Sequence, residues 1–471
     1  MQKSHEAEHL DGNHGISRLR LRIAYGAMLI AAAVLFFVLD TWGKELVAPA
    51  TEPAAEPGAA VPASKADALV HLLIALAVVL IAGRLLGRLF YYLGQPPVMG
   101  EVVAGILLGP SLLGEVWPAA AAFILPSSLA PNLAVVSQLG VILYMFLVGL
   151  ELNLGVLRRQ AHAAVVIAHT SIVVPFLLGV ALALLLYPRF AGHAVAFTPF
   201  ALFVGIALSI TAFPVLARIL TDRQMQRTPL GILALGCAAI GDVTAWCLLA
   251  FVVGVAQAKL GDALVTLALA AAYIALMFLV VRPIAFRFLA HFEKPPLPRG
   301  LTALIFAALL LSALATEAIG IHALFGAFLL GAIIPHDSVL ARTFLSNLED
   351  LVTVLLLPAF FAFTGMRTHI GLVSGMEQWL ICGLIIVAAT VGKVGGTLFS
   401  ARLGGLGWRN ATALGLLMNT RGLMELIVLN IGLDLNVISP PLFAMMVLMA
   451  VATTMATAPL LQLLHPKNAE P

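Results

Sequence analysis

Residues 235–250 read LGCAAIGDVTAWCLLA, and Asp242 is the sole charged side chain in this apolar run. A charge inside a membrane span costs roughly 2.5–3.5 kcal/mol on insertion scales, so it normally has a partner or a function. A desolvated carboxylate can let a proton and a cation compete for the same oxygens near physiological pH. The structural alternative is a carboxylate that hydrogen-bonds a neighbouring helix. Asp242 is therefore the first candidate ion- and proton-binding residue.

The composition around this run is that of a membrane protein. The chain has 471 residues, of which 61% are hydrophobic and only 10% are charged. Soluble domains carry about 25% charged residues, so this chain could not cover itself with a water-soluble surface. The net charge of +3 is too small to indicate nucleic acid binding. Cys237, Cys247 and Cys382 lie in apolar runs without metal-ligand spacing. We therefore expect an all-α polytopic membrane protein.

The chain divides into three parts. Residues 1–66 contain a polar start, an apolar run at 23–39 and an Ala/Pro/Glu-rich linker at about 41–66. The run fits either a signal peptide or a retained anchor helix, and we favour the anchor because the run is long for a signal core. A transmembrane domain at 67–464 follows, and a short tail at 465–471 ends the chain.

Thirteen candidate spans are expected after the first apolar run. They lie at about 67–89, 98–113, 132–152, 162–187, 198–220, 229–256, 262–282, 301–316, 320–335, 349–366, 377–400, 409–432 and 439–464. Basic residues concentrate in alternate loops, and Arg189, Lys259 and Arg367 are nearly alone on the other side. The excess of basic residues in cytoplasmic loops predicts a cytoplasmic C-terminus.

Further charges lie inside the apolar spans. Lys393, in AATVGKVGGTLFSARL, could neutralise Asp242 when no cation is bound, although a lysine can also extend to the membrane interface. Arg421 and Glu425 are four residues apart, which places them on one helical face as a pair. That pair is either structural or part of the ion site.

Two spans carry helix-breaking sequences. One contains Thr211 ahead of Pro214, and proline removes a helical hydrogen bond. The other contains the run Asn419-Thr420-Arg421-Gly422. Matched interruptions in two halves of a membrane chain indicate an inverted-repeat transporter with a site at the membrane midplane.

Four other polar residues have simpler interpretations. Glu101 and Glu151 lie near span ends, where we expect interfacial or helix-capping roles. Glu317 and His322 flank a short turn on the outside. A pH-sensing role is open to His322, but we favour a packed or hydrogen-bonded histidine.

These stretches resemble the monovalent cation:proton antiporter-2 family, whose members share a sodium/hydrogen exchanger domain. The resemblance covers about residues 67–464, and its motifs are most similar to those of potassium-type and plant and fungal cation/proton exchangers. The motifs that carry it are QPPVMGEVVAGILLGPSLLG, FLVGLELN, SITAFPVLARIL, GDVTAW, IHALFGAFLLGAIIP and NTRGLMELIVLNIG. The resemblance implies a 13-helix inverted-repeat core with two crossed broken helices, a dimerisation domain and a mobile domain. It implies that Asp242 binds the cation and the proton, with Lys393 and Thr211 at the same site.

One position departs from the family pattern. The residue before the key aspartate is often Asp, Asn or Gln in the family, but here it is Gly241. A single carboxylate suits one-for-one exchange, unless Lys393 also carries a proton, so the stoichiometry and the choice between K⁺ and Na⁺ stay open.

The resemblance predicts a homodimer in the plasma membrane, or in the inner membrane if the source is bacterial, that exchanges K⁺ or Na⁺ for H⁺. We expect no cofactor, no nucleic acid partner and no nucleotide-binding domain in this chain. The alternatives are a cation channel, a regulatory membrane protein without transport, and a membrane-embedded enzyme. The last has no metal-ligand cluster, nucleophile motif or phosphate loop to support it.

Overall fold

The computed structural model describes residues 2–49, 65–151, 161–192, 195–226, 228–257, 260–289, 291–292 and 297–464. The predicted tail, most of the predicted linker, and Lys259 with several other basic loop residues lie outside these ranges. Within them the regular structure is helical, and the sole β-type contact is an isolated bridge between Ala191 and Ile438. The expected all-α class is therefore confirmed for the described part of the chain.

The helices are short where polar residues or prolines interrupt the apolar runs, and long elsewhere. In chain order they are α1 (Gln2–Gly43), α2 (Lys65–Tyr92), α3 (Pro97–Leu108), α4 (Leu113–Val116), α5 (Pro118–Ile124), α6 (Ala130–Glu151), α8 (Ala161–Phe190), α9 (Phe197–Ser209), α10 (Phe213–Asp222), α11 (Pro229–Gln257), α12 (Leu260–Leu276), α13 (Arg282–Leu289), α14 (Arg299–Ile319), α15 (Ala323–Ile333), α16 (Val339–Asp350), α17 (Leu357–Arg367), α18 (Gly375–Leu403), α19 (Trp408–Met418), α20 (Leu423–Asp434) and α21 (Pro440–Leu464). Short 3-10 segments (Ser127–Leu129 and Ile370–Leu372) and π-helical segments (Met277–Val281 and Leu351–Leu356) lie between some of them.

Eleven helices in the described ranges are long and apolar enough to cross a membrane, or up to twelve if the bent pair α19 and α20 is one span. This number includes the first apolar run, at Ile23–Gly43. The expected spans at 198–220 and 320–335 do not reach this length. The first of them is divided into α9 and α10, and the second is the 11-residue helix α15. The 13-helix inverted-repeat arrangement therefore stays a prediction.

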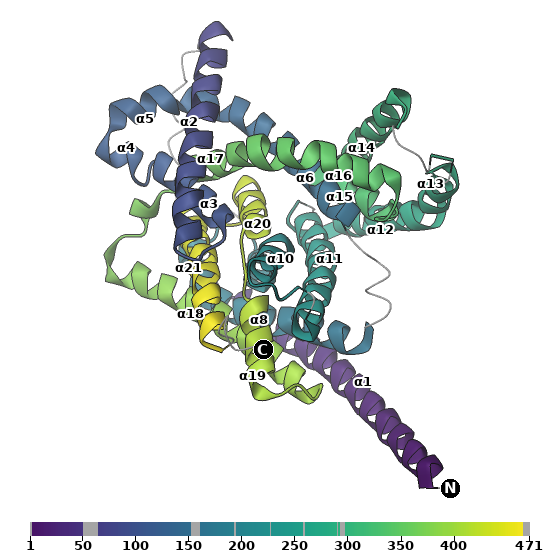
Figure 1. Ribbon diagram of the computed structural model, residues 1–471. Helices are drawn as coiled ribbons and strands as arrows, with labels where there is room; N and C mark the ends of the chain where they lie inside the picture. Colours follow the sequence, from purple (N-terminus) through teal and green to yellow (C-terminus); the bar gives the residue numbers. More distant parts are fainter. Residues whose placement is uncertain are drawn as a thin grey trace.

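The helices form a bundle around a small group of short central elements (Figure 1). Figure 1 shows α10 and α20 near the middle of the molecule, with α18, α19 and α21 on one side and α12 to α14 on the other. The most extensive packing joins α8 to α9 and α18, α6 to α15, and α2 to α3. The N-terminal part of α1 extends away from the bundle. Its C-terminal part is fixed where the buried Asp40 accepts a hydrogen bond from Thr198 Oγ1 over 2.6 Å.

Glycine brings one pair of central helices into close contact. A Cβ atom added to Gly149 of α6 would lie 2.9 Å from the Cα of Gly331 in α15, and the reverse substitution gives the same distance. Because membrane helices gain stability from close backbone packing, small residues belong at such a crossing. This contact fixes α6 beside the centre of the bundle.

Candidate functional site

The centre of the molecule contains two helix interruptions that contact each other. One lies between α9, which ends at Ser209, and α10, which begins at Phe213. The other lies between α19 and α20, which meet at an angle of 45°. The Ala212 backbone N–H donates a hydrogen bond to the Thr420 carbonyl oxygen over 2.9 Å. Two non-helical segments from distant parts of the sequence are thus joined inside the apolar core.

Most polar side chains of these segments donate hydrogen bonds to backbone carbonyl oxygens of the two interruptions. Thr211 Oγ1 donates to the Met418 carbonyl oxygen over 2.9 Å, and Thr420 Oγ1 donates to Leu417. Asn419 is buried, and its side-chain oxygen has no hydrogen-bond partner among the described residues. Pro214 lies in the first turn of α10, a position that tolerates proline because the N–H it lacks would be unpaired there.

Asp242 lies on α11, opposite the start of α10. It is 5% exposed, and its carboxylate accepts a hydrogen bond from the Phe213 backbone N–H. The N-terminus of a helix carries partial positive charge, so α10 stabilises a negative group at this position. A cavity of about 10 Å³ adjoins the carboxylate and is also lined by Trp246, Met424 and Val428. The site can therefore hold one small charged species but not a large solute.

Two buried cations occupy the opposite end of the first interruption. Lys393, on α18, donates a hydrogen bond to the carbonyl oxygen of Ser209. Arg421 donates to the carbonyl oxygens of Ala207 over 2.7 Å and Leu208 over 2.5 Å. The last turn of a helix leaves carbonyl groups unpaired and carries partial negative charge, so cations stabilise it. The two ends of the broken helix are thus matched by charges of opposite sign.

The predicted pairing of Arg421 and Glu425 is present. Their side chains are fully buried, and Arg421 Nη1 lies 2.9 Å from Glu425 Oε2. The sequence placed both residues on one helical face, but Arg421 lies in the interruption and Glu425 in the first turn of α20. Lys393 interacts electrostatically with this pair and with Asp242. The four residues form one buried network of ionisable side chains, two of them basic and two acidic.

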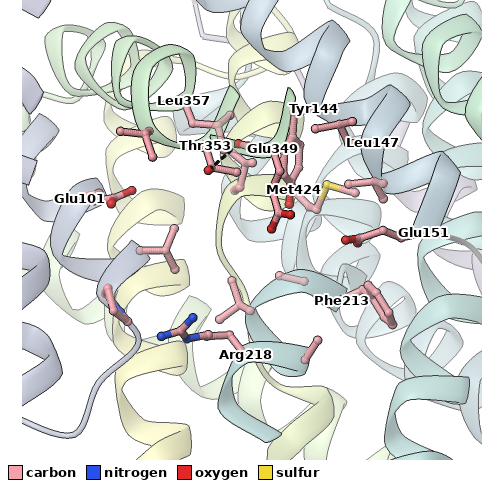
Figure 2. A pocket seen from close by; sticks show the side chains of 18 of the residues that line it. Glu101, Tyr144, Leu147, Glu151, Phe213, Arg218, Glu349, Thr353, Leu357 and Met424 are labelled. Carbon is pink, nitrogen blue, oxygen red and sulfur yellow. Dashed lines mark hydrogen bonds between the residues drawn. The ribbon is translucent and has the colours of Figure 1, made fainter. Parts of the chain in front are cut away.

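A cavity of about 600 Å³ opens beside this network and is shown in Figure 2. Glu101 and Glu151 line it together with Glu349, so carboxylates of α3, α6 and α16 converge on one space. Arg218 of α10 lies across the cavity from Glu349 in the same view. Met424 lines both this cavity and the small one at Asp242. The wide, charged space and the small cavity at the buried carboxylate therefore adjoin each other at Met424.

The cavity residues are the part of the site that sequence reasoning missed. We expected Glu101 and Glu151 at interfaces or helix caps, and the structure places both on the cavity wall. Glu349 and Tyr144 carried no signal beyond a position near a span end or inside an apolar run. Glu317 acts as a cap, because its carboxylate accepts from the Ala323 N–H over 2.7 Å. His322 has a buried Nδ1 with no hydrogen-bond partner among the described residues, which fits the packed histidine of the two expected forms.

No group of three or more His, Cys, Asp or Glu side chains in the described part of the chain could hold a metal ion. The predicted monovalent cation at Asp242 would have that single carboxylate as its charged ligand.

Comparison with known proteins gives a consistent result. Residues 69–463 match the family described as sodium/hydrogen exchanger, transmembrane. Over 384 residues the chain is 45% identical to the Na(+)/H(+) antiporter NhaS4 of Synechocystis. The aligned region covers 81% of this chain and 94% of that protein. The chain is 39% identical to cation/H(+) antiporter 20 of Arabidopsis thaliana over 79% of this chain, and 32% identical to K(+)/H(+) antiporter 1 of Saccharomyces cerevisiae over 80%. The chain spans about half the length of the plant and yeast relatives, at 46% and 44%.

Proposed function

Because the chain belongs to the sodium/hydrogen exchanger transmembrane family, we propose that it exchanges K⁺ or Na⁺ for protons at Asp242. The observation that carries the proposal is the position of this carboxylate. It is buried, it faces the N-terminus of α10, and its cavity shares the lining residue Met424 with a much larger one. A cation that enters the large cavity would thus have a short route to a site that also binds a proton.

Coupling follows from the low dielectric of the surrounding core. A carboxylate with neither a proton nor a cation is charged, and moving that charge through an apolar barrier is costly. Asp242 would change sides when it carries one of its two ligands, which links their flows in opposite directions. Lys393 would balance the empty carboxylate through the electrostatic interaction between them.

We infer that Asp242 is reached from the large cavity. This cavity is lined by Arg84 of α2, Glu151 of α6, Thr221 of α10 and Glu349 of α16. By the distribution of basic residues we assign the side of this cavity, and the C-terminus, to the cytoplasm. Alternating access would require the part that holds α9, α10, α19 and α20 to move against the rest of the 67–464 domain, in a homodimer.

The test uses purified protein in liposomes with an imposed pH gradient and an enclosed pH dye. We expect K⁺, Na⁺ or both, but not choline, to dissipate the gradient. Asp242→Asn should reduce the response to that of protein-free liposomes, because the amide binds neither a proton nor a cation in exchange. Retained cation-dependent proton flux in this variant would contradict the assignment of Asp242. No response of the wild-type protein to either cation would contradict the exchange itself.

A further inference from the structure

The three cavities of the central bundle are arranged along one helix. At the start of α20, Leu423 and Met424 line the large cavity, and Met424 and Val428 line the cavity at Asp242. Near its end, residues including Ile431 and Asp434 line a third cavity of about 40 Å³. Ten residues of α-helix span about 15 Å, so α20 passes the buried carboxylate and continues towards the opposite side.

Two neighbouring helices follow the same course. On α6, Ser137 and Val141 line the third cavity, and Tyr144 and Glu151 line the large one. Residues at these spacings share one face of a helix, and the fourteen residues from Ser137 to Glu151 span about 21 Å. On α17, Leu357 lines the large cavity, and Phe360 and Phe363 line the third. The three helices α6, α17 and α20 therefore each contribute residues to both the large and the third cavity.

The third cavity, which we call the outer cavity, contains polar atoms without partners. Ser137 is 1% exposed, and neither its Oγ nor the buried Nδ1 of His322 has a hydrogen-bond partner among the described residues. Both residues line the cavity with Asn430 and Asp434. A buried hydroxyl without a partner costs free energy, which a bound water or ion would recover. A cavity of this size accommodates one small ion with a water molecule.

Arg367, at the end of α17, contacts two of the residues that line the outer cavity. Its Nη2 lies 2.5 Å from Asp434 Oδ1, and its Nη1 donates to Asn430 Oδ1 over 3.1 Å. The amide group of Asn430 donates in turn to Thr364 Oγ1 and to the Leu426 carbonyl oxygen, which directs the Asn430 oxygen towards the guanidinium. The guanidinium thus holds the two acceptors that a small cation would use, and it joins α17 to α20.

We propose that the outer cavity is a second binding site for a monovalent cation, and that Arg367 competes for two of its oxygen ligands, on Asp434 and Asn430, in this structure. Asp434, Asn430 Oδ1 and Ser137 Oγ would supply the oxygen ligands once the guanidinium moves away. One carboxylate with neutral oxygens suits a singly charged ion, and hard cations prefer oxygen ligands. Departure of Arg367 would also remove one of the links between α17 and α20 on this side, and the hydrogen bond from Asn430 to Thr364 would remain. The role of the site in transport rests on the proposed function, whereas its capacity to bind a cation does not.

The experiment measures equilibrium binding of ²²Na⁺ and ⁸⁶Rb⁺, the latter as a K⁺ substitute, to purified protein. All variants carry Asp242→Asn, which removes the proposed inner site. We expect Arg367→Gln to increase the affinity for one cation about tenfold, because a competing charge is removed from the carboxylate. Adding Asp434→Asn should abolish that gain. The matched control is Arg189→Gln, which removes an exposed arginine–glutamate pair, with Glu377, at the start of α18.

Equal binding with and without Arg367→Gln would overturn the proposal, and so would a gain that survives Asp434→Asn or also appears in the control. A second measurement does not depend on affinity. In a variant without native cysteines, Ser137→Cys should react faster with a cationic thiol reagent when Arg367 is glutamine, and Na⁺ or Rb⁺ should slow that reaction. An unchanged rate would also count against the proposal. Cation–proton exchange by the Asp242→Asn variant in liposomes would instead contradict the proposed function. The binding measurements would still decide whether the outer cavity binds a cation.

Discussion

At the scale of the residue, Arg421 is a buried arginine whose guanidinium has several partners. It is fully buried, pairs with Glu425, and binds two carbonyl oxygens at the end of α9. We expect Arg421→Gln to lower the free energy of unfolding by about 3–5 kcal/mol, because it leaves a buried carboxylate without its partner. Thermal unfolding in detergent measures the loss.

The control for this prediction is Arg189→Gln. Its pair with Glu377 is exposed, with side-chain exposures of 46% and 71%, so its removal should cost at most about 1 kcal/mol. The double variant Arg421→Met with Glu425→Met should regain part of the stability, since no unpaired charge is then buried. Equal losses for Arg421→Gln and Arg189→Gln would show that the buried pair contributes little.

The second residue-scale prediction concerns competition at Asp242. If one carboxylate binds either ligand, protons raise the apparent KM for the cation and leave the maximal rate unchanged. Where the site is mostly protonated, each unit of decrease in pH should raise this KM about tenfold. Initial exchange rates at a series of pH values and cation concentrations test this relation. A KM that is constant across pH, with a changing maximal rate, would indicate separate sites for the two ions.

At the scale of the element, the crossing of α6 and α15 is the most sensitive to substitution. Gly331→Val would place side-chain atoms against the backbone of α6, where a single Cβ already lies 2.9 Å from the Gly149 Cα. We expect a loss of about 1–3 kcal/mol, measured as a lower thermal transition, because the helices must separate. Gly395→Ala is the matched control, since a Cβ there meets nothing within 4 Å. Equal behaviour of the two variants would contradict close packing as the cause.

The helices also show how far sequence reasoning could reach. Single buried charges such as Asp242 and Lys393 stand out in an apolar run, and proline or polar runs indicate where a helix is interrupted. The number of membrane spans was harder to predict from the sequence, because an interruption divides one apolar run into two short helices such as α9 and α10. The convergence of Glu101, Glu151 and Glu349 could not be predicted at all. From the sequence, a carboxylate near a helix end is interpreted as a helix cap. Only the tertiary packing shows that these three carboxylates line one cavity.

At the scale of the whole molecule, the large cavity predicts one-sided access. In a variant without native cysteines, Glu349→Cys should react with a membrane-impermeant thiol reagent in inverted vesicles and not in right-side-out vesicles. Met376→Cys, at the opposite end of the bundle and 77% exposed, should show the reverse. The ratio of labelling in the two preparations is the measurement. Labelling of both variants from the same side would contradict the orientation that we assign from the basic loops.

The glycine beside the central carboxylate has a consequence for the energy source of the cell. Gly241 leaves Asp242 without a neighbouring acidic side chain, so if Lys393 carries no proton, the proposed cycle returns one proton for each cation that leaves. Such a cycle moves no net charge. A membrane voltage of 100 mV changes the energy of one translocated charge by about 2.3 kcal/mol, and that contribution would cancel. The exchanger would respond to the two concentration gradients alone and would run equally well in an electrically depolarised membrane.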